Sequence, residues 1–124
     1  MIMEIYKEHI LDLYKNPQNK KILNNFTSEF SKNNLICGDT IQVQLLIQKE
    51  KIKDIGFSGD GCAISQASAS LLTDKIKNMS IKQIKNLTKE DVLELLKIPI
   101  SYARLNCALL PLDAIKGALE NAGN

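Results

Sequence analysis

The chain has 124 residues and a net charge of +2, which gives room for one domain with a modest core. Its 16 basic and 14 acidic residues are too evenly balanced to favour nucleic-acid binding, and few aromatic residues stand among the lysines to stack on bases. No apolar run approaches the roughly 20 residues that a membrane helix needs, so we expect no membrane partner.

The first half of the chain predicts one helix and three strands. Apolar residues recur at helical spacing over residues 3–16, and Glu and Asp within that pattern argue against a signal peptide, so we expect a cytoplasmic protein. The helix should end before Pro17. A short strand is expected at 27–31. Strict alternation over 40–48 predicts a half-buried strand, and residues 52–58 form its antiparallel partner in a hairpin.

A glycine-containing turn precedes the next predicted helix. Gly59 and Gly61 end the strand, and Asp60 between them can bond the first free backbone amides of the helix. Alanine and serine line this helix. Because small side chains let another backbone come close, we expect tight packing against a neighbouring element.

Three further helices are expected in the last third of the chain. The patterns Ser-x-x-Gln and Thr-x-x-Asp are capping boxes and predict helices near 81–86 and 89–97. A last helix is expected over 111–122, because proline suits the first helical turn. The order of helix, strands and then helices indicates an α+β fold. We expect a single domain, residues 1–124, in which a small three-stranded antiparallel sheet packs against several helices.

The chain has three cysteines, Cys37, Cys62 and Cys107, whose spacings match no zinc-knuckle pattern. An odd number of cysteines in a cytoplasmic protein argues against disulfides, which leaves buried packing or chemistry. All three fall at predicted ends of elements, whereas a packing cysteine is more natural in the middle of an apolar helix face. Their positions therefore favour chemistry.

A thiol and a carboxylate stand together where the second strand is expected to begin. If that strand starts near Cys37, its side chain and that of Asp39 point to the same face, the apolar face that packs under helices. A carboxylate at the end of an apolar face is costly unless it is paired, and a metal ion would pair it. The simpler alternative is a turn that happens to contain a cysteine.

The other two cysteines also have neighbours that suit a thiolate. Cys62 stands at a predicted helix N-terminus, where backbone amides favour negative charge. Arg104 precedes Cys107 by three residues and would lie on the same side of a helix, where it could steady a thiolate or a persulfide. The alternatives are a small packing cysteine and a surface arginine beside a buried cysteine. Three thiolates and one carboxylate would suit zinc, or an iron–sulfur cluster with one weak ligand and hence a site built for release.

Four ordered motifs carry a family resemblance: YKEHILDLYKNPQN, CGDTIQVQL, GFSGDGCAISQASASLLTDKI and RLNCALLPLDAIKGAL. They resemble the U-type iron–sulfur cluster assembly scaffolds, namely IscU, SufU and the first domain of NifU, over residues 4–121. The resemblance implies a compact α+β fold and a cysteine desulfurase partner that hands over persulfide sulfur. It also implies that four side chains converge on one exposed site that holds zinc or a [2Fe–2S] cluster: Cys37, Asp39, Cys62 and Cys107.

Two features separate the branches of this family. IscU-type members carry a histidine directly before the last cysteine, where this chain has Asn106, and an LPPVK chaperone-docking stretch that this chain lacks. The stretch GCAISQASAS and Arg104 are similar to the SufU type. The last two cysteines are only 45 residues apart, which is too short for the usual SufU insertion. The sequence is thus SufU-like in motif and IscU-like in length.

The sequence is therefore compatible with three functions. The first is a scaffold that accepts sulfur, at Cys37 or Cys107, and assembles a transient [2Fe–2S] cluster for recipient apo-proteins, with Asp39 as the labile ligand. The second is a zinc-dependent sulfurtransferase of the SufU type, in which Arg104 steadies the persulfide. The third is a structural zinc domain. The sequence leaves open the resident metal, whether the protein acts as an enzyme, and whether a homodimer forms around a shared cluster.

Overall fold

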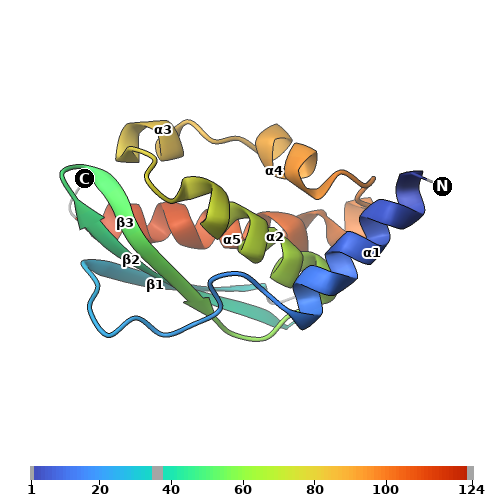
Figure 1. Cartoon of the computed structure of the whole chain (residues 1–124), viewed down its shortest axis with the longest axis horizontal. Helices are drawn as coiled ribbons and strands as arrows, with labels where there is room; N and C mark the ends of the chain where they lie inside the picture. Colours follow the sequence, from blue (N-terminus) through green and yellow to red (C-terminus); the bar gives the residue numbers. More distant parts are fainter. Residues whose placement is uncertain (1, 35–37, 123–124) are drawn as a thin grey trace.

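The computed structural model describes residues 2–34 and 38–122, with side chains from Lys7 onward. The elements in these ranges are, in chain order, α1 (Ile2–Lys15), β1 (Ser28–Asn34), β2 (Asp39–Gln48), β3 (Lys51–Ser58), α2 (Ala63–Ile76), α3 (Ile81–Lys85), α4 (Lys89–Leu96) and α5 (Tyr102–Asn121). Five helices thus accompany one three-stranded sheet within the described residues, and the predicted α+β fold is confirmed (Figure 1). None of the described helices is both long and apolar enough to cross a membrane.

The sheet is an antiparallel meander in the order β1-β2-β3. The predicted hairpin joins β2 to β3 through Lys49 and Glu50, whose φ angles of 53° and 63° suit a tight two-residue turn. β1 extends beyond the expected range of 27–31 and reaches Asn34. Its last residues are polar and show no apolar alternation, so the sequence pattern misses them. Backbone pairing with β2 holds them, and the last pair joins Asn34 to Asp39.

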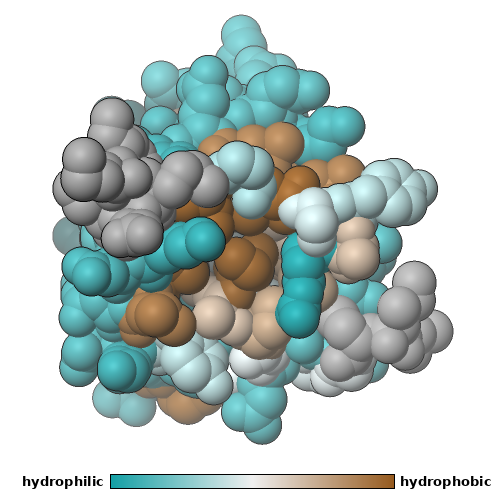
Figure 2. All heavy atoms as spheres, turned by 90° about the vertical axis from the view of Figure 1, so that its right-hand side faces the viewer, coloured by the Kyte–Doolittle hydropathy of each residue, from teal (hydrophilic) through white to brown (hydrophobic). Residues whose placement is uncertain are grey.

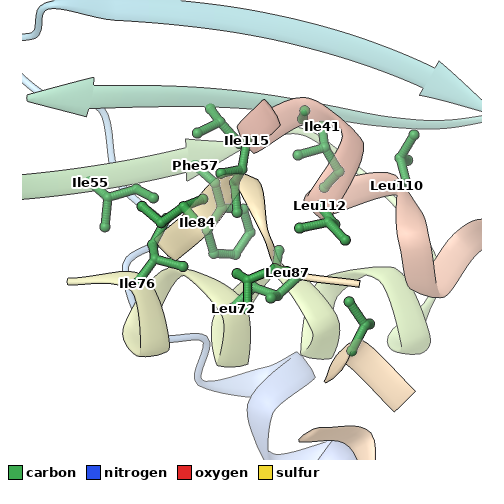
Figure 3. Packing of buried hydrophobic residues seen from close by; sticks show 14 of the residues in the cluster. Ile41, Ile55, Phe57, Leu72, Ile76, Ile84, Leu87, Leu110, Leu112 and Ile115 are labelled. Atoms are coloured by element: carbon green, nitrogen blue, oxygen red, sulfur yellow. The ribbon is translucent and has the colours of Figure 1, made fainter. Parts of the chain in front are cut away.

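The helices cover one face of the sheet. α5 packs on β1 and β2, α2 packs on β3 and on α5, and α1 lies against the outer side of α2. The alternating residues Ile41, Val43 and Leu45 of β2 are completely buried under this helical layer. Figure 3 shows how residues from β2, β3 and the helices interlock in this core, with Phe57 and Leu72 among them. This layer fixes α2 and α5 relative to the sheet edge where the candidate site lies.

Small residues bring α5 close to α2 and to β1. Close packing was expected from the alanine- and serine-rich sequence of α2. The hydroxyl of Ser68 on α2 donates a hydrogen bond of 2.6 Å to the carbonyl of Ala108 on α5. On the other side of α5, a Cβ atom at Gly117 would collide with the ring of Phe30 on β1. These close contacts determine where α5 lies between α2 and the sheet.

The predicted start of the last helix at Pro111 is wrong. α5 begins at Tyr102, with Ser101 as its N-cap, and Pro111 lies inside it. An internal proline removes one intrahelical hydrogen bond, the one to the carbonyl of Cys107, and costs about 3 kcal/mol or more. Buried residues on both sides of Pro111 pack against the sheet and α2 and outweigh that cost. Cys107 is consequently buried in the second turn of α5, not at a helix start.

The predicted caps are correct for two helices and wrong for one. Both capping boxes form, with Ser80 before α3 and Thr88 before α4. The N-cap of α2 is Cys62, without a side-chain cap hydrogen bond, so Asp60 does not cap this helix. Asp60 instead contributes its backbone carbonyl, which accepts a hydrogen bond of 2.8 Å from the amide of Thr40.

Candidate metal centre

One end of the molecule gathers three element ends that are distant in sequence. The β1–β2 edge, the start of α2 and the first turns of α5 meet at the end of the molecule where α1 also lies (Figure 1). Here Asp39, Cys62 and Cys107 each offer one ligand atom, and these three atoms lie within 4.8 Å of one another. The fourth predicted ligand, Cys37, lies outside the described residues.

Asp39 supplies a buried carboxylate. It is the first residue of β2 and is only 5% exposed. Among the described residues, its Oδ2 atom is buried and has no hydrogen-bond partner. A buried carboxylate oxygen without a donor is expensive, and a cation beside it removes that cost. β2 begins at Asp39 itself, directly after Gly38 with its φ of 76°. Whether Cys37 shares a face with Asp39 concerns a residue outside the described ranges.

The glycine turn holds Cys62 against the start of β2. Gly59 has a φ of 114°, and a Cβ atom there would collide with the backbone carbonyl of Thr40. The carbonyl of Asp60 accepts the amide hydrogen of Thr40 at 2.8 Å. Because Thr40 follows Asp39 directly, these backbone contacts fix the half-buried Cys62 thiol near the Asp39 carboxylate.

The absence of a side chain at Gly61 leaves space for the side chains of Ser65 and Asp39. A Cβ atom at this position would collide with the hydroxyl of Ser65 and would lie 3.1 Å from the carboxyl carbon of Asp39 and 3.3 Å from its Oδ2 atom. The Ser65 hydroxyl itself donates to the carbonyl of Cys62 at 3.1 Å. A side chain at position 61 would therefore push on both the helix start and the carboxylate.

Replacing Gly61 by alanine tests this packing. We expect the metal-free protein to lose about 1–3 kcal/mol of unfolding free energy, because overpacking forces neighbouring groups to shift. Zinc binding should weaken as well, since the displaced groups include the Asp39 carboxylate. Urea unfolding and zinc competition titrations measure the two effects. Asp60→Ala, at the exposed neighbouring position, should change neither, and equal losses in both variants would contradict the account.

Cys107 and Arg104 come from successive turns of α5. The side chain of Cys107 is 1% exposed, whereas Arg104 is exposed. Hydrogen bonding to Cys62, followed by the charges of Cys62 and Cys107, raises the pKa of Arg104 above its ordinary value. The arginine thus places a permanent positive charge near the α2 and α5 cysteines.

Asn34 is a neighbour of the site that sequence reasoning missed. Its side-chain amide donates to the Sγ atom of Cys107 at 3.9 Å. The only signal was its position three residues before Cys37, and the first strand was expected to end at residue 31. Asn34 was therefore expected to lie outside the sheet.

The donor set fits a thiophilic metal ion. Zinc binds thiolate sulfur at about 2.3 Å and carboxylate oxygen at about 2.0–2.2 Å in tetrahedral sites, so ligands of one ion stand roughly 3.5–4 Å apart. Two thiols and a carboxylate that lie within 4.8 Å are close to that requirement. The unpartnered oxygen of Asp39 supports a cation at the same place. Iron, alone or in a cluster, is also bound by thiolates.

Comparison with known proteins identifies the chain's relatives. The sequence profile described as "NifU-like N terminal domain" matches residues 5–122. The chain belongs to this family. The resemblance to U-type scaffolds is thereby confirmed, and the family contains both iron–sulfur cluster assembly scaffolds and SufU-type sulfur acceptors.

Individual relatives point to both branches. The protein named zinc-dependent sulfurtransferase SufU from Bacillus subtilis is 34% identical over 97% of this chain and 94% of its own length. The iron–sulfur cluster assembly scaffold protein IscU from Escherichia coli is 30% identical over 94% of this chain and 92% of its own. The crystal structure of a SufU described as a putative scaffold from Fervidobacterium islandicum superimposes with a TM-score of 0.78. It is 28% identical and covers 94% of this chain and 97% of its own.

Proposed function

We propose that this protein accepts sulfur from a cysteine desulfurase and serves as the scaffold on which a [2Fe–2S] cluster is assembled for recipient apo-proteins. The observation that carries this proposal is the buried Asp39 carboxylate, with one oxygen unpartnered among the described residues, within 4.8 Å of two thiols. A site that held metal permanently would more simply use a fourth thiolate. An oxygen donor binds iron in a cluster less tightly than sulfur does, which favours release.

Sulfur acceptance is a thiol exchange in this proposal. A cysteine thiolate of the chain, Cys37 or Cys107, attacks the outer sulfur of the desulfurase persulfide. The sulfur–sulfur bond of that persulfide breaks, the desulfurase thiolate leaves, and a persulfide forms on this chain without net oxidation or reduction. Because Cys107 is 1% exposed, attack from this residue requires local opening of the site. Arg104 stands where it can balance the charge of the new persulfide.

Cluster formation then converts the carried sulfur to sulfide. This conversion requires electrons, which iron(II) supplies in part as it becomes iron(III), and an external thiol or ferredoxin-type reductant supplies the rest. The chain contributes the ligands, for which we propose Cys37, Asp39, Cys62 and Cys107.

The surface around the site supports a protein partner. Figure 2 looks at this end of the molecule and shows hydrophobic residues gathered in the middle of the face, largely surrounded by hydrophilic ones. Exposed large side chains on the elements at this end include Leu11 and Tyr14 on α1 and Tyr102, which is 92% exposed, at the start of α5. Such apolar surface beside a reactive site is typical of a docking area, and we assign it to the desulfurase.

The second candidate is a zinc-dependent sulfurtransferase. It is favoured by the contacts of Arg104 with both described cysteines and by the 34% identity to the SufU of Bacillus subtilis. In this function the same ligands hold zinc, one cysteine accepts the sulfur as a persulfide, and no cluster forms on the chain. A purely structural zinc site would show neither persulfide nor effect on the desulfurase.

Metal analysis distinguishes these functions. We expect protein purified without oxygen to take up iron and sulfide and to develop a visible chromophore stable enough to isolate, because the donor set can hold a cluster. Zinc, iron and sulfide are measured before and after reconstitution. Stoichiometric zinc that resists exchange by iron, together with persulfide on the chain, would favour sulfur transfer. Zinc without persulfide and without stimulation of a cysteine desulfurase would contradict both functions.

A further inference from the structure

Asn34 and Asp39 form the last cross-strand pair of β1 and β2. Directly paired residues of an antiparallel ladder point to the same face of the sheet, with Cβ atoms about 4.5–5.5 Å apart. Asp39 and Ile41 are buried on the helix-covered face, so the half-buried Asn34 points to that face too. Asn33 is the neighbour on the opposite face and is exposed. The strand thus places one of two adjacent asparagines at the site.

The Asn34 amide reaches the sulfur of Cys107. Its Nδ2 atom lies 3.9 Å from Sγ, with the amide as donor. Arg104, one turn earlier in α5, also acts on this sulfur, chiefly through its charge. The two groups differ in origin, since Asn34 belongs to the sheet and Arg104 to the same helix as the cysteine. The amide from the sheet therefore ties the position of the α5 sulfur to the β1–β2 edge, where Asn34 pairs with Asp39.

We propose that Asn34 is a positioning residue for Cys107, whose amide orients the sulfur toward the metal and withdraws electron density from it when metal is bound. This inference rests on the proposed metal centre. Groups that hydrogen-bond to a metal ligand fix the orientation of that ligand and change how strongly it donates electrons to the metal. Their loss typically weakens metal binding by about 10–100-fold. Hydrogen bonds to ligand sulfur likewise change the reduction potential of iron–sulfur clusters. A neutral amide does this without adding a charge or a competing thiol.

Cobalt(II) is the probe, because its charge-transfer absorption with thiolates reports directly on the ligand sulfur. Asn34→Ala removes the amide, and Asn34→Leu removes the N–H donor while keeping a side chain that branches at the same carbon. Asn33→Ala is the matched control on the exposed face of the same strand. Each protein is titrated with cobalt(II) without oxygen, and circular dichroism verifies the fold.

Both Asn34 variants should show the sulfur-to-cobalt band at longer wavelength than the wild type, because a sulfur without the hydrogen bond holds its electrons less tightly. Their cobalt dissociation constants should rise about tenfold, the lower end of the effect of such neighbours. Asn33→Ala should match the wild type. If Asn34→Ala does not fold, Asn34→Leu alone decides. A band that does not move in the Asn34 variants, or that moves equally in Asn33→Ala, overturns the role of Asn34 and leaves the proposed function standing. A wild-type protein that gives no cobalt–thiolate band overturns both.

Discussion

Replacing Asp39 by alanine should lengthen the lifetime of a reconstituted [2Fe–2S] cluster by about tenfold, which corresponds to about 1.4 kcal/mol in the barrier to release. The carboxylate is the only non-sulfur group in the proposed ligand set. Its loss removes the donor through which an incoming ligand or water would most easily exchange. The decay of visible absorption in the presence of an apo-ferredoxin acceptor measures this lifetime.

The same substitution should affect the metal-free protein in a way that does not depend on clusters. Asp39 is 5% exposed, and its Oδ2 atom has no partner among the described residues. Removing such a group relieves a desolvation cost of about 1–3 kcal/mol, less the cost of the small cavity left behind. We therefore expect metal-free Asp39→Ala to be more stable than the wild type by about 1 kcal/mol in urea unfolding.

Zinc should reverse this order of stability. A ligand that binds only the folded state adds stability according to its affinity, and the variant binds zinc more weakly because it has lost one ligand. Saturating zinc should therefore stabilise the wild type more than Asp39→Ala. The exposed Asp60→Ala variant serves as the control and should behave like the wild type throughout. A shorter cluster lifetime in Asp39→Ala, or a destabilised metal-free fold, would contradict the proposed role of this carboxylate.

Local patterns were sufficient to predict most of the fold. The alternation in β2, the hairpin and the two capping boxes depend on neighbours in the sequence, and all of them are present in the structure. The failures share a different cause. The N-terminal half of α5, with Pro111 inside the helix, is held by packing on α2 and the sheet, which no local pattern reveals. The polar end of β1 is likewise held by pairing with β2.

The site residues divide in the same way, into those that sequence motifs predict and those that depend on contacts between distant segments. Residue chemistry and the family motifs alone predict Cys37, Asp39, Cys62, Arg104 and Cys107 as site residues. Two features could not be inferred in that way. Asn34 reaches Cys107 only because an extended β1 faces α5, and Gly61 matters because a side chain there would meet Asp39 and Ser65. Both depend on contacts between segments that are distant in sequence.

Replacing Arg104 by alanine should slow persulfide acceptance from the desulfurase by about 100-fold, which is typical for the loss of one preorganised donor to a developing anion. The guanidinium interacts with Cys62 and Cys107, so when Cys107 is the acceptor its charge lies beside the new persulfide, whose outer sulfur is readily deprotonated. Arg104→Lys keeps the charge but not the planar set of donors, and it should recover only part of the rate.

The pH dependence of the transfer rate distinguishes stabilisation of the persulfide by Arg104 from an effect of Arg104 on the ionisation of the cysteine thiols. The pKa of Arg104 is raised further above its ordinary value, mainly by its hydrogen bond to Cys62. A raised pKa means that the positive charge is present below that value and is lost only above it. Arg104 therefore stays charged from about pH 6 to 9, far below the usual arginine range. The rate ratio between wild type and Arg104→Lys should accordingly be constant over this interval.

Single-turnover transfer from a persulfide-loaded desulfurase, followed by mass spectrometry of the trapped cysteines, measures these rates. Saturating amounts of this protein ensure that weaker docking does not appear as slower transfer. Lys89→Ala, which removes an exposed cation at the start of α4, is the matched control and should leave the rate unchanged. If Arg104→Ala accepts sulfur as fast as the wild type at saturation, the arginine acts in docking or in structure. If Lys89→Ala slows transfer equally, general electrostatic attraction explains the effect, and the specific contact with the two cysteines does not.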